Sequence, residues 1–138
     1  MKVVGLDIGN KRIGIAVSDS AGRVAVPSRT FVRVGDLDRD ISRLAEVILE
    51  YEPVAVIAGV PVSLSGEIGP QAVVVLSELK ILSERIGLEI RTQDERLTTR
   101  AATAALRVAG KTSKQQRSIV DAISAAIILQ DWLDSERD

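Results

Sequence analysis

The sequence of 138 residues contains neither cysteine nor histidine, and these two absences restrict its chemistry more than any other feature of its composition. Without cysteine the chain forms no disulfide and holds no metal through thiolates. Without histidine it has no imidazole general base, no Ser-His triad and no histidine-based zinc site. Any metal ion must therefore be bound by oxygen atoms, which favours Mg²⁺ or Mn²⁺.

Aromatic residues and long apolar runs are also scarce. Aromatic residues make up 2% of the chain and hydrophobic residues 46%, so the core must consist mainly of Val, Ile, Leu and Ala, which is typical of a sheet covered by helices. No apolar run reaches the roughly 20 residues of a membrane-spanning helix, and the N-terminus lacks the pattern of a signal peptide. We therefore expect a single cytoplasmic domain over residues 1–138, without membrane contact.

The net charge of −1 does not by itself indicate a polyanionic partner, but the charge is unevenly distributed. Residues 91–117 contain seven basic and two acidic residues, whereas residues 36–52 contain six acidic and two basic ones. The basic segment could form a surface that faces phosphates. Both segments could equally be ordinary solvated helix faces.

The hydrophobic periodicity predicts strands and helices in the order βββ-α-β-α-β-α-α. The predicted strands are residues 2–8, 12–18, 24–34, 54–60 and 88–92. The predicted helices are residues 36–51, 70–86, 98–109 and 118–133, and the basic segment 111–117, which lacks apolar residues, is predicted to be a mobile loop. The first three strands, joined by short turns, form an antiparallel meander. The order as a whole predicts an α/β fold with a five-stranded mixed sheet and helices on both faces.

Two carboxylates occupy positions that are unusual for a charge. Asp7 is the lone charge near the end of an apolar strand, where burial is costly unless a cation is nearby; it could also simply cap the following turn. Asp121 shares a helical face with Ala125 and Ile128. It also completes a capping-box pattern with Ser118, which would place it at the start of a helix for structural reasons.

A third acidic position follows the fifth predicted strand. Asp94 and Glu95 stand at its C-terminal end, where sheets of this kind bind ligands, although the pair could also be part of a charged loop. If Asp7, Glu95 and Asp121 converge, they form an all-oxygen pocket for one or two Mg²⁺ ions, which could activate water and stabilise the leaving oxygen of a phosphodiester.

Four segments together resemble the YqgF (RuvX-like) family, in the family's order and over nearly the whole chain. The segments are residues 6–19 (LDIGNKRIGIAVSD), 59–66 (GVPVSLSG), 94–99 (DERLTT) and 121–130 (DAISAAIILQ). Val60 and Ser124 depart from the residues that are commoner in the family, and neither is a metal-ligand position. The resemblance implies an RNase H-like fold and a metal-dependent nuclease that is related to Holliday-junction resolvases and matures the 5′ end of precursor 16S ribosomal RNA.

Motif by motif, the resemblance implies that Asp7, Glu95 and Asp121 are the catalytic acids and metal ligands. It implies supporting phosphate or site roles for Arg12 and Arg96. The basic stretch 91–117 adds candidate substrate-binding residues, namely Arg100, Lys114 and Arg117. Whether Asp94 assists Glu95 or only shapes the turn stays open at this point.

Several functions remain compatible with the sequence. The leading hypothesis is a Mg²⁺- or Mn²⁺-dependent endonuclease acting on structured precursor rRNA, and the same site could instead act on branched DNA. A third possibility is a nucleic-acid-binding module without catalysis, which the scarcity of aromatic residues for base stacking disfavours. A sugar kinase or related ATPase would need a second domain, for which 138 residues leave no room. The chain could be a monomer or a homodimer.

Overall fold

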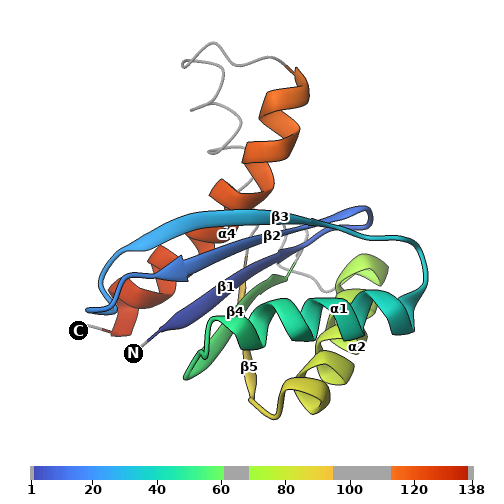
Figure 1. Cartoon of the computed structure of the whole chain (residues 1–138), viewed down its shortest axis with the longest axis horizontal. Helices are drawn as coiled ribbons and strands as arrows, with labels where there is room; N and C mark the ends of the chain where they lie inside the picture. Colours follow the sequence, from blue (N-terminus) through green and yellow to red (C-terminus); the bar gives the residue numbers. More distant parts are fainter. Residues whose placement is uncertain (1, 61–68, 95–112, 137–138) are drawn as a thin grey trace.

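The computed structural model describes residues 2–60, 69–94 and 113–136, and these contain a five-stranded mixed sheet (Figure 1). The strands are β1 (Val3–Ile8), β2 (Arg12–Ser18), β3 (Ala25–Val32), β4 (Ala55–Val60) and β5 (Ile90–Asp94). They lie in the order β3-β2-β1-β4-β5. The first three form an antiparallel meander, while β4 is parallel to β1 and β5 is parallel to β4.

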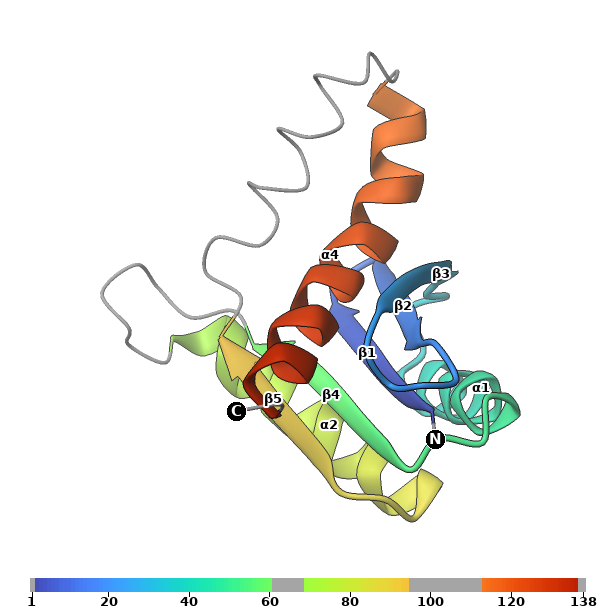
Figure 2. The same cartoon turned by 90° about the vertical axis from the view of Figure 1, so that its left-hand side faces the viewer.

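Three helices in the described ranges cover both faces of this sheet. They are α1 (Leu37–Glu50), α2 (Pro70–Ile86) and α4 (Ser113–Glu136). Figures 1 and 2 show α1 and α2 together on one face and the long α4 crossing the other. The predicted fold class, with its meander and its helices on both faces, is therefore confirmed.

Local signals explain where the first two helices begin and end. Asp36 precedes α1 and its side chain accepts a hydrogen bond from the backbone N–H of Arg39 at 3.2 Å, as expected of an N-cap. Gly87 follows α2 with a φ of 72°, the left-handed conformation that glycine adopts most readily and that commonly ends a helix. The predicted bounds of α2 match the structure residue for residue.

Alternation along β1 divides the core into two layers. Val4, Leu6 and Ile8 pack into the cluster on the side of α1 and α2. Val3 packs into the cluster on the side of α4. Since strand residues two apart share a face, Asp7 points to the same side as Val3, toward α4.

A glycine on that face allows α4 to approach the sheet closely. A Cβ at Gly5 would lie 2.7 Å from the Cβ of Leu129 and 2.9 Å from the backbone oxygen of Ala125. Ala125, Ile128 and Leu129 are fully buried. The face that Asp121 shares with Ala125 and Ile128 is therefore the face that α4 packs on the sheet.

The start of α4 corrects two predictions. The segment 111–117 was expected to be a loop, yet α4 begins at Ser113. Asp121 and Ser118 consequently lie inside the helix, so the predicted capping box at its start is wrong. Lys, Gln and Arg are good helix formers without any apolar contact, and Figure 1 shows the first turns of α4 extending beyond the sheet, where no apolar face is needed.

Other elements deviate less. The fifth strand, predicted at 88–92, runs instead from Ile90 to Asp94, and the predicted helix 98–109 lies outside the described residues. Within the described part of the chain, no helix combines the length and apolarity needed to cross a bilayer.

Candidate active site

Asp7 is the penultimate residue of β1, in the middle of the sheet. Its neighbours in register are Gly14 on β2 and Gly59 on β4, and Gly59 is itself aligned with Gln93 on β5. The two positions beside Asp7 therefore carry no side chain that could cover its carboxylate. Asp7 itself is half-buried.

Gly14 also determines where α4 lies. A Cβ added at this position would overlap the backbone carbonyl of Asp121, so the helix backbone rests directly on the glycine. Gly14 is at the same time the cross-strand partner of Asp7. Asp7 and Asp121, which are more than a hundred residues apart in the sequence, are thus both adjacent to one glycine.

Arg12 adds a cation to this pair of acids. It is the first residue of β2, and its Nε donates a hydrogen bond to Oδ2 of Asp121 at 2.6 Å. The side chains are 36% and 18% exposed, respectively. A partly exposed ion pair contributes little to stability, but this one fixes the orientation of the Asp121 carboxylate and partly balances the acidic charge.

The turn between Asp7 and Arg12 is short and well bonded. The backbone N–H of Gly9 donates to the backbone oxygen of Arg12 at 2.9 Å, and Ile8 pairs with Ile13. Asp7 and Arg12 therefore stand on opposite sides of one tight turn, whose geometry sets the position of both.

The other predicted site residues are less fully placed. Glu95, Arg96 and Arg100 lie outside the described residues, and for Lys114 and Arg117 the structure describes the helical backbone alone. Asp94 ends β5, where it is in register with Val60. Within the described residues, no group of three or more acidic side chains could hold a metal ion. The described part of the site thus consists of Asp7, Asp121 and Arg12.

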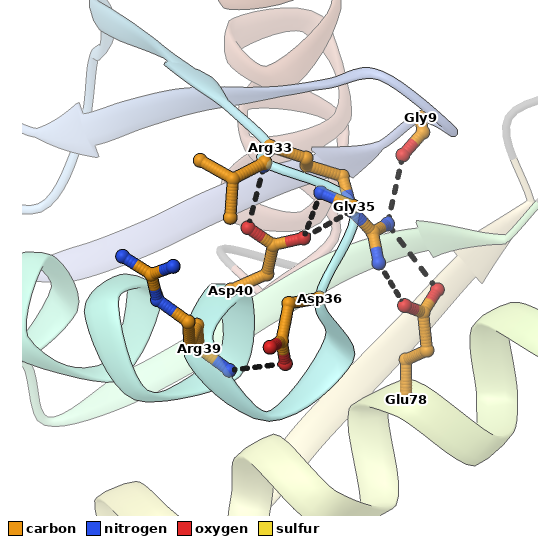
Figure 3. A network of polar contacts seen from close by, with 8 residues as sticks. Gly9, Arg33, Gly35, Asp36, Arg39, Asp40 and Glu78 are labelled. Atoms are coloured by element: carbon orange, nitrogen blue, oxygen red, sulfur yellow. Dashed lines mark hydrogen bonds and ion pairs between the residues drawn. The ribbon is translucent and has the colours of Figure 1, made fainter.

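Sequence reasoning missed a buried ion network beside this site. The carboxylates of Asp40 and Glu78 both contact the guanidinium of Arg33 under the Gly9 turn (Figure 3). A signal existed for Asp40, which shares the apolar face of α1 with Leu44 and Ile48 at helical spacing. Nothing in the local pattern distinguishes Arg33 or Glu78 from solvated residues.

The arrangement of strands and helices has a counterpart among solved structures. RuvC from Thermus thermophilus matches with a TM-score of 0.60 and 17% sequence identity over 99% of this chain and 96% of that chain. The complex of the same protein with a Holliday-junction substrate matches with a TM-score of 0.58. This similarity confirms the RNase H-like fold, which defines the structural class of the chain.

Sequence comparison identifies the family within that class. The chain belongs to the family described as "RuvX: Holliday junction resolvase", which matches residues 1–135. This membership confirms the predicted relationship, and with it the prediction of a hydrolase of the nuclease class.

Curated relatives share about two fifths of its residues and carry the name "Putative pre-16S rRNA nuclease". The relative from Clostridium kluyveri (strain ATCC 8527 / DSM 555 / NBRC 12016 / NCIMB 10680 / K1) is 42% identical over 97% of both chains. That from Mycobacterium sp. (strain KMS) is 41% identical over 97% of this chain and 80% of its own length. That from Desulforamulus reducens (strain ATCC BAA-1160 / DSM 100696 / MI-1) is 38% identical over 98% of both chains.

Proposed function

We propose that this chain is a metal-dependent endonuclease that cleaves structured RNA and processes the 5′ end of precursor 16S rRNA. The observation that carries the proposal is the approach of Asp7 and Asp121 to the same glycine, Gly14, from opposite ends of the sequence. The names of the relatives support precursor rRNA as the substrate. The proposed active unit is a single cytoplasmic domain of residues 1–138, as a monomer or homodimer.

The donor atoms available at Gly14 fit a hard divalent cation. Asp7 and Asp121 supply carboxylate oxygens and are both half-buried, and the chain has no histidine or cysteine to offer a softer site. Mg²⁺ and Mn²⁺ are the ions that such ligands favour. We assign Asp7, Asp121 and Glu95 as the metal ligands, with Glu95 following directly after the last residue of β5.

Each residue then has a distinct task. A bound divalent ion supplies Lewis-acid chemistry, which activates water and neutralises charge on the phosphate. Asp7 holds its carboxylate from the rigid centre of the sheet, and Asp121 does so from a helix seated on the same strands. Arg12 keeps the Asp121 carboxylate oriented through its 2.6 Å hydrogen bond, and its positive charge favours the approach of a phosphate.

The surface beside Arg12 suits a phosphate backbone. A hollow of about 440 Å³ opens next to the turn, between Lys11 and Arg12 on one side and residues 32–35 on the other. Lys11 and Arg12, which line this hollow, can contact the substrate strand. We propose that Arg96, Arg100, Lys114 and Arg117 also contact the substrate.

Branched DNA is the second candidate substrate. The description of the family and the junction complex of the RuvC protein favour it, whereas the names of the relatives favour precursor rRNA. The proposed metal chemistry is the same for both, since it acts on the phosphodiester and not on the base or the sugar.

A cleavage assay with matched substrates distinguishes these alternatives. With Mg²⁺ or Mn²⁺ present, we expect the enzyme to cleave fragments of precursor 16S rRNA and to cleave a four-way DNA junction more slowly or not at all. In EDTA we expect neither substrate to be cleaved. Faster cutting of the junction would assign the enzyme to branched DNA. If neither substrate were cut, and Mg²⁺ and Mn²⁺ left the melting temperature unchanged, the chain would be a binding module without catalysis.

Replacing Arg12 with glutamine tests the role of the Arg12–Asp121 pair. A hydrogen bond to a charged group contributes about 1.5–3 kcal/mol where it is fully formed, so we expect kcat/KM to fall about 10- to 100-fold. The unfolding free energy should change by less than about 1 kcal/mol, because the pair is partly exposed. Steady-state cleavage and urea unfolding measure the two quantities.

Arg85→Gln is the matched control for this substitution. Arg85 forms an exposed ion pair with Asp38, with Nη2 and Oδ1 2.5 Å apart, away from Gly14. We expect this variant to cleave at the wild-type rate. Equal losses of activity in both variants would contradict a specific role for Arg12.

A further inference from the structure

One residue holds both ends of the turn that joins Asp7 to Arg12. The Nη1 atom of Arg33 donates to the backbone oxygen of Gly9 at 2.9 Å. The backbone N–H of the same residue donates to the backbone oxygen of Lys11, also at 2.9 Å. Arg33 follows directly after β3, so a residue from the neighbouring strand end fixes the turn from outside.

The guanidinium of Arg33 is in turn held by carboxylates from α1 and α2, the two helices on the face of the sheet opposite α4 (Figure 3). Glu78 of α2 accepts hydrogen bonds from both Nη1, at 3.4 Å, and Nη2. Oδ2 of Asp40 in α1 lies 3.7 Å from Nε. The side chains of Arg33 and Glu78 are each 12% exposed and that of Asp40 is 2% exposed, so this network is shielded from solvent.

Asp40 also fixes the backbone that follows Arg33. Its Oδ1 accepts from the N–H of Val34 at 2.8 Å, and its Oδ2 accepts from the N–H of Gly35 at 3.2 Å. The hydrogen bond that Arg33 donates to Glu78 is the main reason why the pKa of Arg33 is raised above its ordinary value, with the charges of Glu78 and Asp40 adding to it. The guanidinium of Arg33 therefore stays protonated.

Stability alone does not account for such a network. Removing charges from water costs about as much as their attraction returns, and apolar residues of similar volume often replace buried ion pairs without loss. An apolar side chain, however, does not provide directed hydrogen bonds. The planar guanidinium donates to Glu78 and to Gly9 at the same time, which a lysine ammonium on a flexible stem does not reproduce.

We infer that Arg33 is a positioning residue of the active site. It holds the turn 9–11 against α1 and α2, and thereby sets the direction in which Asp7 and Arg12 face Asp121 across Gly14. In this way α1 and α2, on one face of the sheet, influence the positions of the Asp7 and Asp121 carboxylates on the other face. The inference rests on the proposed function for its catalytic consequence, whereas its effect on the turn is independent of that proposal.

The test replaces Arg33 with methionine in the full chain. We expect kcat to fall about 10- to 100-fold, because a small misplacement of catalytic groups has effects of this size, with KM changed less than about threefold. Hydrogen exchange of the amides in the turn should become at least about tenfold faster. Arg33→Lys should restore the charge but little of the rate, and Glu78→Gln should show a smaller loss of the same kind.

The control is Arg85→Met, which removes an ion pair between the same two helices without touching the turn; it should leave kcat and turn exchange unchanged. Wild-type kcat and wild-type exchange in Arg33→Met would overturn the inference, as would full rescue by lysine. If Arg33→Met does not fold, Glu78→Gln must show the kcat loss and faster exchange, or the inference fails. A wild-type chain that cleaves nothing would refute the proposed function alone, because turn exchange still tests Arg33.

Discussion

Replacing Asp7 with asparagine is expected to lower the cleavage rate about a thousandfold or more while the protein stays folded. Asparagine has nearly the same size but no negative charge, so a divalent cation loses a ligand that contributes several kcal/mol of charge stabilisation. Because the neighbours of Asp7 in register, Gly14 and Gly59, carry no side chains, we expect the substitution to leave the packing of the sheet unchanged. Single-turnover cleavage and the melting temperature are the two measurements.

The matched control is Asp19→Asn. Asp19 lies in the turn between β2 and β3, and its Oδ1 accepts from the backbone N–H groups of Arg23 and Val24. An asparagine oxygen can accept the same bonds, so we expect the activity to remain at the wild-type level. An Asp7→Asn variant that cleaved as fast as Asp19→Asn would show that Asp7 is not a metal ligand.

The second large effect is expected from Gly14→Ala. The added Cβ would overlap the backbone of Asp121, and neither the β2 backbone nor the α4 backbone can move aside by rotating a side chain. Overpacking of this kind typically lowers the unfolding free energy by about 1–3 kcal/mol. Because the added Cβ would meet backbone atoms, we expect a loss at or above the upper end of this range. We expect a lower urea midpoint and, because α4 is displaced from β2, cleavage reduced about a hundredfold.

Gly69→Ala is the control for that variant. A Cβ at Gly69 would meet no atom within 4 Å, and its φ of −91° is available to alanine. Because Gly69 is the N-cap of α2, where alanine is less favourable than glycine, its unfolding free energy should fall by no more than about 1 kcal/mol. Equal stability of Gly14→Ala and Gly69→Ala would mean that α4 does not rest on Gly14.

The order of the elements was predictable from sequence, since it depends on periodicity that each segment carries by itself. The first and last residues of an element were not predictable where contacts with other parts of the chain determine them. The shift of the fifth strand to Ile90 illustrates this, because the Oγ of Ser83 donates to the backbone oxygen of Leu88 and ties that residue to the end of α2. The early start of α4 has a different origin, since Lys, Gln and Arg favour a helix by themselves, whereas the prediction relied on an apolar face.

The candidate site was predictable to a similar extent. Asp7 could be found because a lone charge on an apolar strand is costly, and Asp121 because it shares the buried face of α4. Their meeting at Gly14 could not be derived from local pattern, because it depends on the packing of a helix on a strand a hundred residues away. Arg33 could not be found for the same reason, since its partners come from the turn after β1, from α1 and from α2.

The most direct test of the shared carboxylate site is a crystal structure of the wild-type protein with Mn²⁺, located by its anomalous signal. We predict an ion within about 2.5 Å of carboxylate oxygens from both Asp7 and Asp121, with Glu95 completing the site. Carboxylates of Asp7 and Asp121 more than about 8 Å apart, wider than a two-metal cluster can bridge, or an ion bound elsewhere would contradict this account.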